Sequence, residues 1–271
     1  MRRAAAAIVA VLAGSTVAWS MLDPSNARDW SPDHARLPIA AFDGDVARIR
    51  NVRNFSRGAA GTPIPAYEER VYDLTRLTTV WLILTPFSRD WRGPAHAFLS
   101  FGFADSQFVA ISIEARRERG ETYSVLKGAL KRFEILYVIG DERDMIGGRA
   151  ARGDDVYLYP MRATHEQARA LLESMLRRAN ELNERPEFYG SFLNNCTTNI
   201  LRHVNAIATR AIPYGPRIFL PGYSDALAHE RGLIDTELPL EEARRKFYVT
   251  SLAQTQLANP EFSIRIRNNL N

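Results

Sequence analysis

The 271-residue sequence contains a single cysteine, Cys196. A single thiol cannot form a disulfide within the chain. Structural zinc sites that use two or more cysteines are excluded for the same reason. The sequence also lacks the HExxH helix of zinc proteases, the Walker and GxGxxG loops that hold nucleotides, and the GxSxG turn of serine hydrolases. We therefore expect no metal and no other cofactor.

Lysine is almost as scarce, because Lys127, Lys131 and Lys246 are the only lysines among 35 basic residues. The formal net charge is +4. Two explanations for the arginine excess remain open: a bias in composition, and an affinity for anionic headgroups, which arginine binds through paired hydrogen bonds. The basic residues form no concentrated tract, so we expect no nucleic-acid partner.

Long apolar runs are absent except at the N-terminus. Residues 1–22 begin with two arginines after the initial methionine and then contain no further charge. A positive start followed by an apolar stretch of this length is typical of a signal peptide or a transmembrane anchor. The small residues ending at Ala18 would permit cleavage, but we favour an uncleaved anchor, residues 4–22, in the inner membrane over a buried helix. The rest of the chain then faces the periplasm, or is free in it if the signal is cleaved.

The remainder of the chain divides into a linker, a strand-rich part and a helical part. Residues 23–45, rich in proline, aspartate and small residues, are typical of an extended linker. From residue 46 onward, alternating and continuous apolar runs predict strands. These strands are expected within residues 46–55, 70–87 (two strands around a turn), 96–103, 107–115, 132–141 and 154–161.

The apolar period changes at Thr164, which forms a capping-box pattern with Gln167 ahead of apolar residues at helical spacing. Helices are expected at residues 164–184 and about 196–207, with shorter ones within 221–234 and 239–249. Strands followed by helices predict an α+β fold with an antiparallel sheet. We assign residues 46–271 to a single domain.

Cys196 lies where the second of these helices is expected to begin. A buried cysteine acting as a small apolar side chain is the simplest interpretation. The alternative is catalytic, because the free backbone N–H groups and the dipole at a helix N-terminus favour the thiolate, which is the nucleophilic form. The sequence alone leaves both open.

A nucleophilic cysteine needs a base, and His96 is the best candidate among five histidines. It begins a predicted strand and alternates with Phe98 and Ser100 on one face of the sheet. His203 lies on the helix of Cys196, on the order of 10 Å along its axis, which is too far. The histidines expected to be structural or solvated are His34, His165, His203 and His229.

A third group should orient the imidazole. In a hairpin with its turn near Asp105, Glu114 falls roughly opposite His96, and Ser112 on the same face is a weaker candidate. The alternative for Glu114 is a solvated carboxylate paired with Arg116.

Five blocks of the sequence are similar to the Lnb N-terminal periplasmic domain family. The resemblance covers roughly residues 28–236, and the blocks are "AHAFLSFGF", "AISIEARRERGETYS", "YVIGDERD", "PEFYGSFLNNCTTNIL" and "LPGYSDALAHERGLIDT". The family in turn resembles circularly permuted papain-like (NlpC-type) thiol enzymes, in which a strand histidine precedes the cysteine. The resemblance implies such a fold, with an antiparallel sheet packed against the helix that carries the cysteine. It matches Cys196, His96 and Glu114 to the family's cysteine, histidine and acidic positions.

Family members fused to a membrane domain are implicated in N-acylation of bacterial lipoproteins through an acyl-thioester. This chain lacks their multi-helix C-terminal membrane region, so the resemblance implies thiol acyl chemistry more strongly than lipoprotein acylation itself. We expect a periplasmic acyltransferase or hydrolase acting on lipid, lipoprotein or cell-wall peptide. The Cys196 backbone N–H, and Asn194 or Asn195, are candidate oxyanion donors. The alternative function is a non-catalytic envelope module that binds a ligand in the same cleft.

Overall fold

The computed structural model describes residues 22–58, 62–88, 90 and 92–270. Apart from Leu22, the predicted N-terminal span lies outside these residues and stays a prediction. Across the described part of the chain, no helix combines the length and the apolar character needed to span a bilayer.

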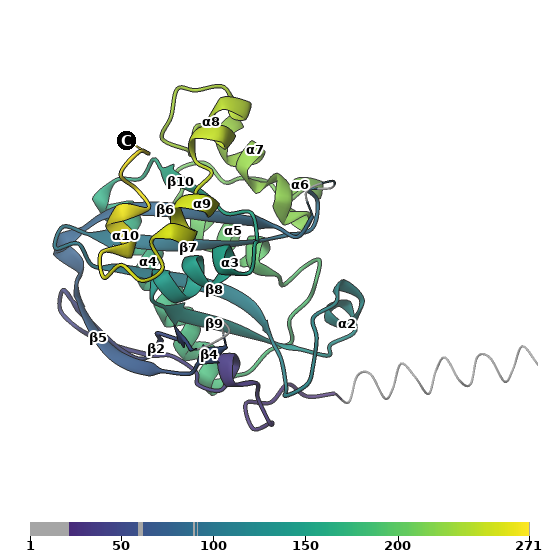
Figure 1. The fold of residues 1–271 in the computed structure, drawn as a ribbon. Helices are drawn as coiled ribbons and strands as arrows, with labels where there is room; N and C mark the ends of the chain where they lie inside the picture. Colours follow the sequence, from purple (N-terminus) through teal and green to yellow (C-terminus); the bar gives the residue numbers. More distant parts are fainter. Residues whose placement is uncertain (1–21, 59–61, 89, 91, 271) are drawn as a thin grey trace, which may run out of the picture.

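An eight-stranded sheet forms the centre of the molecule (Figure 1). Its strands run in the order β1-β2-β9-β8-β7-β6-β10, with β5 paired to β2. A short two-stranded ribbon, β3 and β4, lies apart from it. The bounds are β1 (Ile39–Asp43), β2 (Val46–Arg53), β3 (Ser56–Arg57), β4 (Pro63–Ile64), β5 (Tyr67–Asp73), β6 (Leu77–Pro86), β7 (Ala95–Phe103), β8 (Phe108–Arg116), β9 (Glu134–Gly140) and β10 (Tyr157–Met161).

The apolar runs account for the central strands. Every residue of β7 and of β9 is buried, as expected for strands covered on both faces. The predicted α+β class is confirmed, but the sheet is mixed, because β2 and β9 pair in parallel at Arg53 and Gly140. Glycine suits this point, since an added Cβ on Gly140 would lie only 3.0 Å from the Arg53 carbonyl oxygen.

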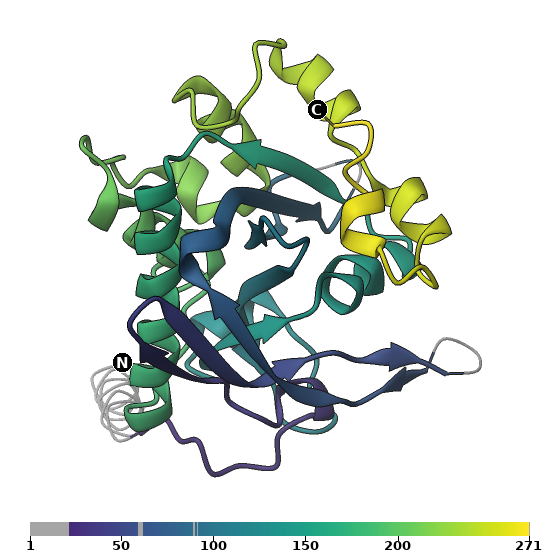
Figure 2. The same ribbon diagram turned by 90° about the vertical axis from the view of Figure 1, so that its left-hand side faces the viewer.

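Helices cover both faces of the sheet (Figure 2). The long helices α4 and α5 pack on one face, and α3, α9 and α10 lie on the other. The capping box predicted at Thr164 begins α4, and the helix expected at 196–207 is α5. The bounds are α2 (Val125–Ala129), α3 (Gly148–Ala151), α4 (His165–Glu184), α5 (Cys196–Ile207), α6 (Pro216–Phe219), α7 (Ser224–Glu230), α8 (Leu240–Lys246), α9 (Thr250–Thr255) and α10 (Phe262–Arg265).

The segment 23–45, expected to be a linker, is part of the folded body in the described structure. Strand β1 joins the edge of the sheet, and a 3-10 turn, Pro32–His34, packs ahead of it. Arg116 holds the turn by donating hydrogen bonds to the carbonyl oxygens of His34 and Ala35. The composition of this segment did not reveal these contacts, because they are made by residues more than 80 positions away.

A buried ion pair fastens the C-terminal part of the chain to the sheet. Arg267, just after α10, donates to Glu142, which is 0% exposed. Ser100 of β7 donates to the same carboxylate, and the guanidinium lies over the rings of Trp81 and Phe108. The last helices are thus an integral layer of the domain.

Candidate active site

The start of β7 and the start of α5 bring His96 and Cys196 together. Cys196 is the first residue of α5, as the sequence predicted. Asn195 caps the helix by accepting a hydrogen bond from the Thr198 backbone N–H, and Thr198 completes a reciprocal capping box. This cap fixes the direction of the first turn, and so the position of the thiol.

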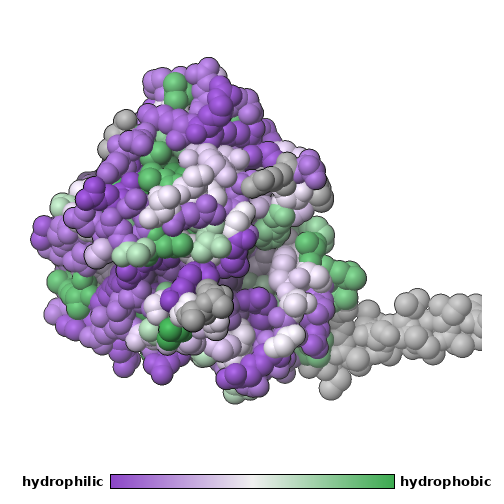
Figure 3. Space-filling view, in the orientation of Figure 1, coloured by the Kyte–Doolittle hydropathy of each residue, from purple (hydrophilic) through white to green (hydrophobic). Residues whose placement is uncertain are grey.

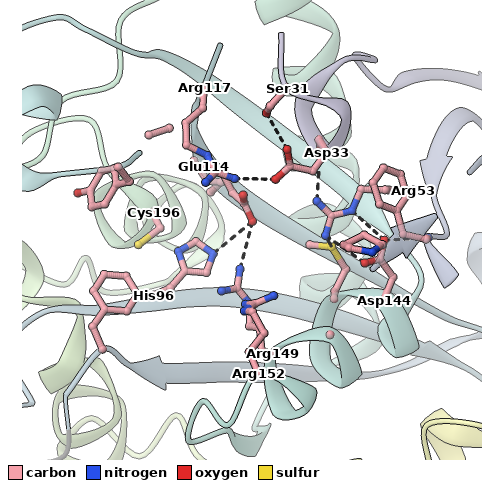
Figure 4. Close-up of a pocket in the computed structure, with 18 of the residues that line it drawn as sticks. Ser31, Asp33, Arg53, His96, Glu114, Arg117, Asp144, Arg149, Arg152 and Cys196 are labelled. Carbon is pink, nitrogen blue, oxygen red and sulfur yellow. Dashed lines mark hydrogen bonds and ion pairs between the residues drawn. The ribbon is translucent and has the colours of Figure 1, made fainter. Parts of the chain in front are cut away.

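Both side chains line an open cleft of about 1540 Å³. Figure 4 shows the Cys196 sulfur beside the His96 ring, on the side of the ring away from the Glu114 carboxylate. Polar groups line one part of the cleft, including the ion pairs of Arg53 with Asp144 and of Arg117 with Asp33. Apolar side chains line another part, among them Phe87, Val125, Phe192, Leu220 and Pro221.

The thiol and the imidazole are both neutral at rest. Burial raises the pKa of the Cys196 thiol, and hydrogen bonds from the backbone N–H groups of Ala97 and Thr197 oppose this only in part. Burial, together with the nearby Arg149 charge, lowers the pKa of His96 to about 3 although the Glu114 carboxylate opposes the shift. Burial therefore opposes the thiolate that the start of a helix would favour, because desolvation outweighs the N–H groups of the helix start. A neutral thiol of this kind needs a base in order to react.

Hydrogen bonds orient the His96 ring. Its Nε2 lies 2.6 Å from Ser112 Oγ, and Ser112 donates its one proton to Glu114 Oε1 at 2.8 Å. Ser112 must therefore accept from His96, which places the ring proton on Nε2. The lone pair on Nδ1 is then free to accept a proton from the thiol.

Glu114 acts on His96 through Ser112. The predicted hairpin register is confirmed where the strands pair, with Leu99 opposite Ile111. Continued outward it sets Glu114 opposite His96, but the direct distance from Nε2 to Oε1 is 3.8 Å. Ser112, the weaker candidate in the sequence, fills this gap.

Glu114 is held as a carboxylate by two residues that the sequence did not identify. His34 donates from Nε2 to Oε2 at 3.0 Å, since its Nδ1 accepts the Arg117 backbone N–H. Arg149 donates to Oε1 at 3.2 Å. Burial would raise the pKa of Glu114, but the His34 hydrogen bond and the Arg149 charge hold it well below its usual range. The expected alternative partner, Arg116, instead contacts the N-terminal segment.

The two asparagines proposed as oxyanion donors have other roles in the structure. The Asn194 amide donates to the Phe188 carbonyl oxygen, and the Asn195 amide donates to the Ser191 carbonyl oxygen. Asn195 lines the cleft, but both amide groups hold the turn before α5. The backbone N–H groups of Cys196 and Thr197, in contrast, are directed at the sulfur.

The remaining histidines contact structural partners. His203 is 4% exposed and lies between Tyr137 and Ser174, with ring nitrogen distances of 2.8 and 2.7 Å to their hydroxyl oxygens. His165 and His229 bond backbone carbonyl oxygens. Within the described residues, no group of three or more His, Cys, Asp or Glu side chains is arranged to hold a metal ion.

Two buried histidines should make the free energy of unfolding depend on pH in the acid range. Burial lowers the pKa of His96 to about 3 and that of His203 to about 4. Between pH 6.5 and 4 the unfolded chain therefore binds more protons than the folded one, and the free energy of unfolding should fall by about 1.4 kcal/mol per pH unit for each histidine. Urea unfolding at several pH values measures this. His203→Gln should remove about half of the slope and the exposed His165→Gln none; a flat profile would contradict the prediction.

Ser112 is a positioning residue whose effect on rate is separable from its packing. Ser112→Ala should slow acylation of Cys196 about 10- to 100-fold, because the imidazole loses the group that fixes its proton on Nε2. Single-turnover kinetics with an activated ester measure the rate, and Ser112→Thr, which keeps the hydroxyl, should restore most of it. Ser100→Ala is the matched control, since this strand serine also donates to a buried carboxylate but does not contact His96. Equal rates in the two alanine variants would assign Ser112 a packing role alone.

A protein-family model matches this chain. The model of the Lnb N-terminal periplasmic domain matches residues 64–218, more than half of the chain, and its description indicates a periplasmic location in bacteria. Neither a curated protein nor a solved structure matches the chain. The match contains His96, Ser112, Glu114, Arg149 and Cys196, whereas His34 lies outside it. The chain belongs to the Lnb N-terminal periplasmic domain family.

Proposed function

We propose that this protein is a cysteine-dependent acyltransferase or hydrolase that works through a thioester at the periplasmic face of the inner membrane. The observation that carries the proposal is the Cys196 thiol beside His96 in an open cleft, with the imidazole oriented through Ser112 by a buried carboxylate. The order of the two residues, a strand histidine followed by a helix cysteine, agrees with the permuted papain-like layout. Residues 4–22 would anchor the domain.

The first step is attack by sulfur on an ester or amide carbonyl. His96 Nδ1 takes the thiol proton as the sulfur–carbon bond forms, and the carbonyl electron pair moves to oxygen. The backbone N–H of Cys196 supports the oxyanion. Glu114, through Ser112, stabilises the imidazolium. When the oxyanion collapses, the bond to the alcohol or amine breaks, and His96 returns the proton to that leaving group.

The second step regenerates the thiol. An amine or a water molecule attacks the thioester carbonyl and gives its proton to His96, and the same proton then passes to the departing sulfur. With an amine the reaction is acyl transfer, and with water it is hydrolysis. The cleft has an apolar part and a part rich in ion pairs, which suits a substrate with an acyl chain and a polar head or peptide.

Mass spectrometry of the single cysteine tests the proposal. Full-length protein is incubated with phospholipid vesicles, a diacylated lipopeptide or a cell-wall peptide, and the peptide containing Cys196 is analysed for an added acyl group. We expect an adduct that hydroxylamine removes and that Cys196→Ala lacks. The burial of the thiol favours a second candidate, a module that binds a ligand without reacting. Ligand binding with no adduct from any of the three donors would support that second function.

A further inference from the structure

An exposed apolar surface borders the cleft. It consists of side chains from α2 and from the loop before α5, and we call it the apolar rim. Figure 3 shows hydrophobic side chains gathered over α2 at the edge of the molecule. The exposed fractions are 44% for Val125, 69% for Leu126, 43% for Leu130, 52% for Phe192 and 75% for Leu193.

The structure holds the two halves of the rim together. Ser191 donates a hydrogen bond to the Val125 carbonyl oxygen at 2.7 Å. Gly128 permits the close approach, because an added Cβ would lie 2.4 Å from Ser191 Oγ and 3.3 Å from the Tyr189 ring. Tyr189 and Ser191 are buried, so these contacts leave the apolar side chains on the outer side. Val125 and Phe192 also line the cleft that contains Cys196, and the rim is therefore its mouth.

Two of the chain's three lysines flank the rim. Lys127 is within α2, and Lys131 follows Leu130 directly. Neither forms an ion pair with any described residue, and Lys131 lies over the Phe188 ring. Exposed leucines interspersed with unpaired lysines are the pattern of a surface that inserts into an anionic bilayer, where the leucines enter the interface and the lysines contact headgroups.

The described chain begins on the same side of the molecule. The Ser25 backbone N–H and the Arg28 guanidinium both bind the Glu134 carboxylate, three residues after Lys131. Figure 1 shows the first described residues below α2 at that edge. The apolar stretch that ends at Leu22 is thus connected to the fold next to the rim.

We propose that the apolar rim, together with Lys127 and Lys131, docks on an anionic lipid bilayer and holds the mouth of the cleft against it. The docking goes beyond an N-terminal tether, because it sets the orientation of the domain and places the opening of the cleft at the bilayer surface. It is independent of the thiol chemistry, since the rim residues are separate from the catalytic groups.

Site-directed fluorescence on vesicles tests the docking. In the full chain carrying Cys196→Ala, single cysteines are introduced at Leu126, at Leu193 and, as control, at Val71, which is 42% exposed on β5 at the far end of the molecule. Each is labelled with an environment-sensitive dye and reconstituted in phosphatidylglycerol-containing vesicles. We expect the dyes at the rim to be quenched by lipids that carry quenchers at acyl-chain depth, and the dye at Val71 to stay in water. Equal quenching at all three positions would overturn the proposal.

The lysines supply a second readout. Lys127→Gln and Lys131→Gln should each lower the ratio of docked to undocked domain about fivefold on anionic vesicles. The matched control, Lys246→Gln on α8, should leave the ratio unchanged. Docking that is the same on neutral and anionic vesicles would contradict the choice of lipid. Shielding of the dyes in lipid-free detergent that rises with protein concentration would show that a second copy covers the rim. Because these docking experiments use protein that carries Cys196→Ala, their outcome does not depend on whether the proposed thiol chemistry is correct.

Discussion

Replacing His96 with alanine is expected to slow acylation of Cys196 about 10²- to 10⁴-fold, the usual effect of losing a general base. The reason is specific to this site. A thiol that was already ionised would keep much of its reactivity without the imidazole, but burial raises the pKa of Cys196 and leaves it protonated. Single-turnover release of nitrophenol from a nitrophenyl ester measures the rate.

Two controls separate this effect from loss of structure. His165→Gln removes an imidazole that hydrogen-bonds the Leu74 carbonyl oxygen outside the cleft, and it should react at the rate of the unaltered protein. Alkylation of Cys196, which is 2% exposed in the folded protein, should be slow in native His96→Ala and become as fast as in the unfolded parent only after unfolding in urea. An unchanged acylation rate in folded His96→Ala would show that the Cys196 thiol reacts without His96 as a base. The proposed mechanism would then be wrong.

Arg267→Met is expected to lower the free energy of unfolding by about 3–5 kcal/mol, as is usual when one partner of a buried ion pair is removed. The substitution keeps apolar contact with Trp81 and Phe108 but leaves the buried Glu142 carboxylate without its cationic partner. Urea unfolding followed by circular dichroism measures the loss. Because α10 ends two residues before Arg267, the same variant tests whether the C-terminal helices unfold together with the sheet.

The adjacent region provides a matched control for this prediction. Arg265 pairs with Glu261 at the surface, with side-chain exposures of 49% and 55%, and Arg265→Met should cost only about 0.3–0.5 kcal/mol. Adding Glu142→Gln to Arg267→Met should restore most of the stability, because it removes the unpaired charge. Equal losses for the two arginine variants would mean that Arg267 contributes no more than a surface residue.

Much of the secondary structure follows from local pattern. Two strands around a turn were expected within residues 70–87, and the structure has β5, a 3-10 turn and β6 there. The helix start at Cys196 was also predictable, because Asn195 and Thr198 form a cap within four residues. The short helices α7 and α8 lie within the segments 221–234 and 239–249 where they were expected, whereas α2 was missed because its leucine, Leu126, faces outward.

The candidate site was predicted in part. Cys196, His96 and Glu114 were selected by residue type and by strand register, and the structure brings all three to one cleft. His34 and Arg149 were missed, because nothing in their local sequence distinguishes them. Each reaches Glu114 from an element distant in the chain, so only the folded structure relates them to the site.

By itself, the sequence determined most of the central strands and the two long helices, where the one thiol lies in its helix and which family the chain resembles, because periodicity, caps and motifs are local properties. The tertiary structure alone decided the charge states and the surroundings of those groups. Burial keeps the thiol protonated, the Ser112 hydroxyl joins imidazole to carboxylate, and a segment resembling a linker supplies His34. Each of these depends on how much water is removed and on which distant groups replace it, and both are properties of the packed molecule.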